Sequence, residues 1–184
     1  MELIILVDHQ DRQIGVEEKL AVHRNGGLLH RAFSIFIFNR RGEMLIQQRS
    51  AQKYHFRNLW TNACCGHPRP GEEVESSARR RLSEKLGFET ALREVFSFVY
   101  SADDPESGLT EREFDHVFVG WFDGTVHPHP DEVSDVRWIA RAELEHDLAA
   151  LPDRYTVWFR EALARLVNLA AWPSGDGSRW PHNT

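Results

Sequence analysis

The sequence predicts an α+β fold in which helices cover a mixed β-sheet, arranged as an α/β/α sandwich. Segments with the composition of strands dominate the first part of the chain, and one strongly periodic helix follows a loop-rich stretch. More strand-like segments come next, and two helical segments close the domain. Strands that are interrupted by one helix and then followed by terminal helices are typical of a sheet with helices on both faces.

The first element is a short strand over residues 2–7 (ELIILV), followed by a turn that contains two aspartates. This stretch is too short for a signal peptide or a membrane span. Cys64 and Cys65 are adjacent, so a disulfide between them would be strained, and we expect free thiols in a reducing compartment. The simplest expectation is a cytoplasmic protein.

A β-hairpin is the clearest element of the sequence. The run FSIFIF over residues 33–38 predicts a buried strand, residues 39–42 predict a turn, and residues 43–48 predict the second strand. Residues 17–23 suit a helical turn or a loop. Residues 50–71 predict a loop-rich region with an unusual concentration of Trp, Cys and His between residues 60 and 67.

One helix is expected over residues 72–86, because apolar residues recur there at every fourth position and Gly87 follows at the place of a C-cap. The remaining elements are expected in this order: strands over 95–100, 113–122 and 133–139, then helices over 141–150 and 153–171.

The composition fits a single globular domain. Hydrophobic residues make up 41% and charged residues 27% of the 184 residues, which excludes a disordered, collagen-like or disulfide-scaffold chain. We expect one domain over residues 1–172 and a flexible tail over residues 173–184. The net charge of −6 gives no general attraction to nucleic acid or to an anionic membrane, so any anionic substrate must be met by a local basic cluster.

A set of histidines and glutamates has the residue types of a metal site: His23, His30, His67, Glu111 and Glu113. The two glutamates are separated by one residue on an expected strand, so both carboxylates point to one face and repel unless a cation lies between them. Mixed nitrogen and oxygen donors suit Mn²⁺ or Mg²⁺, or Zn²⁺ with raised coordination. Because the chain has 10 histidines, a chance grouping of exposed charges is the alternative.

The segment TNACCGHP places Cys65 two residues before His67. A cysteine in this position can be a nucleophile, a metal ligand, an acid/base group or a small buried side chain. The chain lacks a pair of cysteines separated by two residues, which argues against a zinc finger.

Two other groups allow a functional and a purely structural interpretation. Tyr100 and Trp158 are candidates for core packing, although a tryptophan face can also stabilise a cationic intermediate. Four basic residues are able to clamp a diphosphate if they converge, although most such residues are ordinary surface charges: Lys19, Arg49, Lys53 and Arg81.

Eight short segments form a recognisable pattern along the chain: EKLAVH (18–23), LHRAFS (29–34), QRSAQK (48–53), WTNACCGHP (60–68), GE (71–72), RRL (80–82), LG (86–87) and ERE (111–113). Together they resemble the type 1 isopentenyl-diphosphate delta-isomerase family, a member of the Nudix fold superfamily. The similarity covers the chain up to about residue 171, and the joint occurrence of T-N-x-x-C-G-H-P with a downstream E-x-E is its most specific part.

The resemblance implies an enzyme of isoprenoid precursor synthesis that interconverts isopentenyl diphosphate and dimethylallyl diphosphate through a tertiary carbocation. It implies a Nudix-type sandwich with an extra N-terminal strand and C-terminal helices. Cys65 and Glu113 then correspond to the acid/base pair on opposite faces of the substrate, with Tyr100 beside the glutamate and Trp158 facing the cation.

The resemblance also implies one protein-bound divalent ion (Mn²⁺, Mg²⁺ or Zn²⁺) and a Mg²⁺ that arrives with the substrate. The ligands of the first ion correspond to His23, His30, His67, Glu111 and Glu113, and the diphosphate contacts to Lys19, Arg49, Lys53 and Arg81.

One position departs from the family pattern. The family keeps a glutamate immediately before the Leu-Gly that ends the helix, and this chain has Lys85 there, with Glu84 one residue earlier. The second ion would then be held by the Cys65 backbone carbonyl and Glu84. Successive residues of a helix are rotated by about 100° around its axis, so Glu84 need not replace the family's ligand. The other hypothesis is that Lys85 contacts the diphosphate.

Two other functions stay open from the sequence. A Nudix-type hydrolase of a diphosphate-linked substrate is disfavoured, because Arg81 and Lys85 stand where two acids would be wanted for hydrolytic metal ions. A non-catalytic metal-binding or nucleotide-sensing domain is disfavoured by the presence of both Cys65 and Glu113. We expect a monomer or a weak homodimer.

Overall fold

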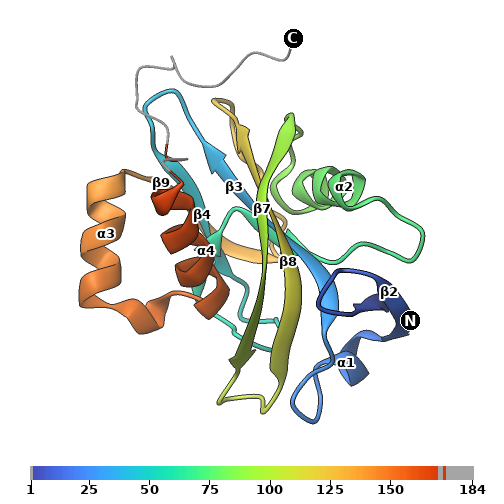
Figure 1. Cartoon of the computed structure of the whole chain (residues 1–184). Helices are drawn as coiled ribbons and strands as arrows, with labels where there is room; N and C mark the ends of the chain where they lie inside the picture. The colour runs from blue at the N-terminus through green and yellow to red at the C-terminus, as the bar shows by residue number, and fades with distance from the viewer. Residues whose placement is uncertain (1, 170–171, 173–184) are drawn as a thin grey trace.

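The computed structural model describes residues 2–169 and 172, and the expected tail over residues 173–184 lies outside them. A curled sheet of nine strands separates α2 (Val74–Leu86) on one face from α3 (Arg141–Ala150) and α4 (Val157–Asn168) on the other, as Figure 1 shows. The sheet contains both parallel and antiparallel pairs, so the predicted α+β class with a mixed sheet is confirmed.

The strand β3 (His30–Phe38) is the axis of this sheet. Along its whole length it pairs in parallel with β8 (Thr110–Trp121). Its other edge pairs in turn with three antiparallel strands: β1 (Leu3–Val7), β6 (Cys64–Gly66) and β4 (Met44–Arg49). All but one residue of β3 is buried, which explains why its sequence is a nearly continuous apolar run.

Four more strands complete the sheet. β2 (Gln13–Glu18) pairs with β1, and β7 (Leu92–Asp103) pairs with β8. β5 (Trp60–Asn62) and β9 (Val133–Ile139) pair with β4. The sequence does not predict β2, β5 or β6. β2 is an edge strand whose two apolar side chains, Ile14 and Val16, are exposed and form too short an alternation to indicate a strand, and β5 and β6 have three residues each.

The helices follow the sequence pattern with one correction. α2 ends at Gly87, whose φ of 73° is the left-handed conformation expected of a C-cap. α1 (Lys19–Val22) is the helical turn expected before β3. The prediction of a single helix over 153–171 is wrong at its start. A 3₁₀ turn spans Pro152–Arg154, Thr156 is extended, and α4 begins only after it. The Thr156 hydroxyl lies 2.8 Å from the Thr61 hydroxyl.

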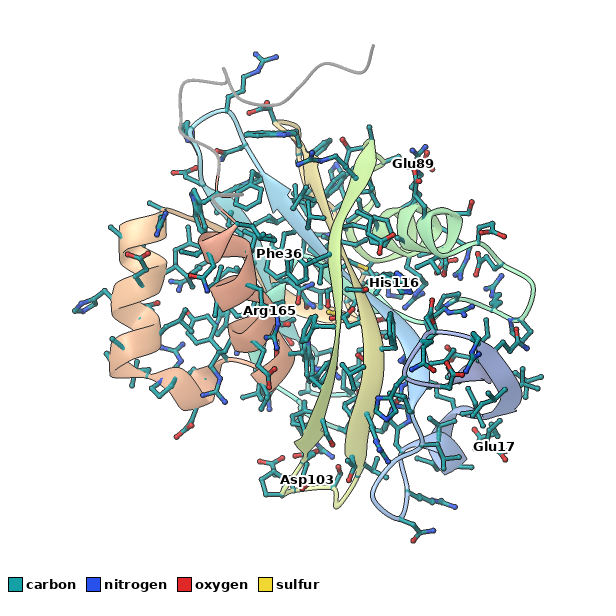
Figure 2. The ribbon with its side chains drawn as sticks, in the orientation of Figure 1. Glu17, Phe36, Glu89, Asp103, His116 and Arg165 are labelled. Atoms are coloured by element: carbon teal, nitrogen blue, oxygen red, sulfur yellow. The ribbon has the colours of Figure 1, made fainter. Side chains whose placement is uncertain are left out.

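Each face of the sheet has its own apolar core. Phe36 of β3 and Phe159 of α4 stack at 5.9 Å between ring centroids on one face, where Figure 2 shows Phe36 between the sheet and the helix. Ile35 and Leu82 belong to the core under α2 on the other face. In the described part of the chain, no helix has both the length and the apolar character needed to cross a membrane.

Candidate active site

A cavity gathers most of the residues singled out in the sequence. Its lining includes Lys19, Arg49, Lys53, Cys65, His67, Arg81, Tyr100, Glu111, Glu113 and Trp158. The lining also contains residues that the sequence did not single out as candidates: Glu2, Tyr54, His55 and Gly66, together with Lys85, the departure from the family pattern. His23 and His30 lie fully buried behind this wall and contact its glutamates.

The register of the sheet brings the proton-exchanging candidates together. On one edge of β3, His30 pairs with Glu113 of β8, and on the other edge Ser34 pairs with Cys65 of β6. Residues paired across strands, and residues an even number apart on one strand, share a face of the sheet. Cys65 and Glu113 therefore reach one cavity from opposite sides of β3.

Two of the three histidines of the predicted metal site, His23 and His30, are held with one ring nitrogen toward the backbone. Nδ1 of His23 lies 2.6 Å from the Lys19 carbonyl oxygen, and Nδ1 of His30 lies 2.8 Å from that of Leu28. These contacts fix the ring orientations and leave each Nε2 toward the glutamates, as is usual for metal-binding histidines. Nε2 of His23 lies 3.0 Å from Glu111.

The donor atoms of four of these residues converge on one point. The ligand atoms of His23, His30, His67 and Glu111 all lie within 4.8 Å of one another. Nε2 of His30 is buried and has no hydrogen-bond partner among the described residues, which is costly unless another group binds it. It lies 3.5 Å from the nearest oxygen of Glu113. This orphaned nitrogen beside two buried carboxylates fits a divalent cation.

The charges of the cluster agree with that fit. Burial opposes ionisation of both glutamates, yet the hydrogen bonds and charges of the histidines hold the pKa of Glu111 well below its usual range and lower that of Glu113. Burial lowers the pKa of His67 to about 4, so this imidazole stays neutral and keeps a lone pair for a metal.

A fourth histidine joins the cluster without any signal in the sequence. His55 belongs to the stretch expected to be a loop, and its Nε2 contacts Glu111 Oε1, the oxygen that His23 does not use. The ring of His55 stacks on Tyr54 at 4.1 Å between centroids. Only the tertiary fold brings this segment to β8, because His55 and Glu111 are separated by 56 residues.

The two candidate proton-exchanging groups have different surroundings. The Tyr100 hydroxyl donates a hydrogen bond of 2.5 Å to Glu113, and the Cys65 thiol donates one of 3.2 Å to the side-chain carbonyl of Asn62. Burial, with the charge of Asp115 in addition, raises the pKa of Cys65 to about 12. Asp115 follows Glu111 and Glu113 on the same face of β8, so the alternation of three acidic residues along this strand is the sequence signal for the third carboxylate.

Trp158 forms an aromatic wall of the cavity. It is 3% exposed and lies 6.1 Å from the Tyr100 ring between centroids. The guanidinium of Arg49 lies 5.3 Å from the indole centroid, within the range of a cation–π contact. Arg49 also donates to the backbone carbonyls of Phe56 and His55 at 2.8 and 3.0 Å, so it fixes the loop as well as lining the cavity.

The predicted basic residues line the cavity and pair with acidic side chains, of which Glu2 also belongs to the lining. Lys19 contacts Glu2 at 2.9 Å. Lys53 and Arg81 both contact Glu132, at 2.5 and 3.2 Å. Burial, with the neighbouring charge of Lys85 in addition, lowers the pKa of Lys53 to about 8. Glu132 stands in no motif, so the sequence offers no sign of this role.

The residues expected to hold a second divalent ion do not fit one. The carboxylate of Glu84 is engaged by Arg80 and Arg81, its side chain is 41% exposed, and it does not line the cavity. The Cys65 carbonyl oxygen accepts a hydrogen bond of 2.7 Å from the Lys85 ammonium. The Lys85 ammonium therefore lies where a metal ion bound to the Cys65 carbonyl oxygen would lie.

Known proteins resemble this chain over most of its length. Residues 28–161 match the NUDIX domain family. The chain is 46% identical over 177 residues to the isopentenyl-diphosphate Delta-isomerase of Halorhodospira halophila, which covers 95% of this chain and 100% of that protein. It is 50% identical to the isopentenyl-diphosphate Delta-isomerase of Burkholderia multivorans, with 89% of this chain and 92% of that protein covered.

Solved structures with lower sequence identity support the fold alone. A crystal structure of a protein from Deinococcus radiodurans has a TM-score of 0.66 at 24% identity and covers 82% of this chain and 90% of its own. A MutT protein from Methanosarcina mazei has a TM-score of 0.64 at 18% identity, with 77% of this chain and 95% of that chain covered.

Proposed function

The chain belongs to the isopentenyl-diphosphate Delta-isomerase family of NUDIX domain proteins, and we propose that it moves the double bond of isopentenyl diphosphate to give dimethylallyl diphosphate, and the reverse. The observation that carries this proposal is the cavity in which Cys65 and Glu113 approach from opposite sides of β3, with Trp158 as an aromatic wall. The chain is an isomerase, and its substrate is a small diphosphate.

The reaction explains why these residue types are needed together. Protonation of an unactivated alkene gives a tertiary carbocation, so the site must exclude water and offer no nucleophile to the cation. The buried faces of Trp158 and Tyr100 supply an apolar, electron-rich wall for that charge. The carbocation then loses a proton from its neighbouring carbon on the side away from the newly protonated one, and this loss forms the isomer.

Cys65 and Glu113 are the two proton-exchanging groups of the proposal. One gives a proton to the double bond and the other removes one from the intermediate, and their roles exchange in the reverse direction. Tyr100 orients Glu113 through the hydrogen bond to Oε2 and is placed to deliver a proton to it or to share one with it. Asn62 positions the Cys65 thiol.

One divalent ion, Mn²⁺, Mg²⁺ or Zn²⁺, has five proposed ligands: His23, His30, His67, Glu111 and Glu113. When bound, such an ion neutralises the two carboxylates and fixes Glu113 in one orientation. The diphosphate has four proposed contacts: Lys19, Arg49, Lys53 and Arg81. All four side chains line the cavity, which supports that role.

The proposal also includes a single domain over residues 1–172, a cytoplasmic location, and a monomer or weak homodimer. The free state of Cys64 and Cys65 supports a reducing compartment. Neither nucleic acid nor membrane is proposed as a partner, since the net charge of −6 attracts neither.

The test is a product assay. Purified protein, loaded with Mn²⁺ or Zn²⁺ and supplied with Mg²⁺, is incubated with isopentenyl diphosphate, and dimethylallyl diphosphate is measured beside released phosphate. We expect the isomer without phosphate from the wild type and from Cys64→Ala, whose thiol is buried in the core under α2, and no isomer from folded Cys65→Ala. Phosphate release without isomer would establish a hydrolase instead.

A further inference from the structure

Lys85 places an ammonium group on the wall of the cavity, beside the basic residues Lys53 and Arg81. It lies in the last turn of α2, its side chain is 7% exposed, and it lines the cavity. Its Nζ donates a hydrogen bond of 2.7 Å to the Cys65 carbonyl oxygen and lies 3.4 Å from Glu132. An ammonium group has three N–H donors, so the hydrogen bond to the Cys65 carbonyl leaves further donors for a ligand.

Glu132 is surrounded by more cations than it can neutralise. Lys53, Arg81 and Lys85 all contact its carboxylate, at 2.5, 3.2 and 3.4 Å. Arg81 also pairs with Glu84 outside the cavity, so one positive charge of the cluster stays without a carboxylate. Burial and the positive charge of Lys85 disfavour the charged form of Lys53, and a bound anion would relieve this repulsion.

The backbone holds this cluster in place without the ligand. The amides of His127 and His129 donate hydrogen bonds of 2.9 and 2.8 Å to the carbonyls of Leu86 and Lys85. These bonds tie the segment that carries Glu132 to the C-terminal end of α2. Lys85 and Glu132 are thus positioned by the same connection, and the cationic site exists before an anion binds.

We propose that the Lys85 ammonium is a diphosphate-binding group that takes the place of a second divalent ion in this chain. The diphosphate joins the cluster of Lys53, Arg81 and Lys85 beside Glu132 and is held by organic cations alone at that end. The Cys65 carbonyl serves Lys85 and not a metal, and diphosphate binding is independent of Mg²⁺. This inference rests on the proposed function for the identity of the anion.

The test measures binding of inorganic pyrophosphate by calorimetry to protein whose histidine site has been loaded with Mn²⁺ or Zn²⁺, in buffer freed of other divalent ions by a chelating resin and again with added Mg²⁺. We expect the wild type to bind pyrophosphate with affinities that agree within about threefold in the two buffers. Lys85→Met, which keeps the length of the side chain, should weaken binding by about tenfold or more, because a charged hydrogen bond is lost. Lys85→Glu should bind only when Mg²⁺ is present.

Arg79→Ala is the matched control, because Arg79 lies on α2, pairs with Glu75 and is outside the cavity. It should bind pyrophosphate as the wild type does. A wild-type affinity that rises more than tenfold with Mg²⁺ overturns the proposal, and this measurement needs no folded variant. Wild-type affinity in folded Lys85→Met also overturns it. Pyrophosphate binding without isomerase turnover would contradict the proposed function and leave the role of Lys85 intact.

Discussion

Tyr100 and Glu113 face each other across β7 and β8, and the Tyr100 hydroxyl lies 2.5 Å from Oε2 of the glutamate. The other carboxylate oxygen lies 2.9 Å from Nε2 of His67. Glu113 is thus held from both sides, by a phenol that belongs to the apolar wall and by an imidazole that belongs to the metal site. This arrangement couples the two halves of the cavity through one carboxylate.

Tyr100→Phe removes the hydroxyl and keeps the ring that packs beside Trp158. We expect kcat to fall by about 100-fold, within the range of acid–base contributions, while KM changes by less than threefold. Steady-state kinetics measure both. Tyr155→Phe is the control, since that hydroxyl contacts Asp147 and Arg137 away from the cavity, and it should leave kcat unchanged. Equal kcat in wild type and Tyr100→Phe would remove the hydroxyl from the mechanism.

Glu113→Gln keeps the size of the side chain and removes its proton-accepting carboxylate. We expect the isomerisation rate to fall by about 1,000-fold or more, while the circular dichroism spectrum remains that of a folded chain. Glu94→Gln serves as the control, because Glu94 contacts His116 outside the cavity. Turnover within tenfold of the wild type in Glu113→Gln contradicts its assignment as a proton-exchanging group.

Trp158 should act on the chemical step more than on substrate binding, because only the transition state carries a cation near the indole. We expect Trp158→Ala to lower kcat by at least tenfold with a smaller change in KM, and Trp158→Phe to retain part of the rate. Trp60→Phe is the control, since Trp60 contacts Arg137 and does not line the cavity. An effect confined to KM argues against stabilisation of a cation.

Metal binding should stabilise the folded chain through the histidine cluster. A ligand that binds only the folded state raises the free energy of unfolding, by about 2.7 kcal/mol at a hundredfold excess over Kd. We expect removal of divalent ions to lower the melting temperature, and Mn²⁺ or Zn²⁺ to restore it. His30→Asn should lose this shift, while His9→Asn, an exposed position, should retain it. Metal analysis of each protein gives the stoichiometry directly.

Glu72 gives a pH-dependent contribution to stability. The bidentate hydrogen bonds from Arg80, at 2.7 and 2.8 Å, lower the pKa of Glu72 from 4.5 to about 2 in the folded chain. A carboxyl whose folded pKa is depressed stabilises the fold above its unfolded pKa and loses this effect as the pH falls toward 2. Urea unfolding should therefore show Glu72→Gln to be less stable than the wild type at pH 7.

The same comparison at acidic pH is the internal control. The stability difference between wild type and Glu72→Gln should shrink progressively below pH 4.5, because both side chains become neutral. A difference that stays constant from pH 7 to pH 3 would mean that the pair with Arg80 contributes through shape and not through charge.

The sequence predicts those parts of the fold in which local patterns are strong. The hairpin of β3 and β4 is visible as an apolar run with a turn, and α2 as a fourfold periodicity ended by Gly87. The sequence does not predict β2, β5 or β6, because an exposed edge strand and strands of three residues have too little hydrophobic alternation. Their pairing partners lie elsewhere in the chain, and a local pattern does not encode them.

The candidate site divides in the same way. The sequence by itself determined the chemical groups, since the family motifs contain the cysteine, the histidines and the glutamates in a recognisable order. Only the tertiary structure decided that His55 and Glu132 join these groups, and that Lys85 and not Glu84 enters the cavity. The physical reason is that strand register and helix rotation set which side chains meet, and both are fixed by long-range packing of the two cores.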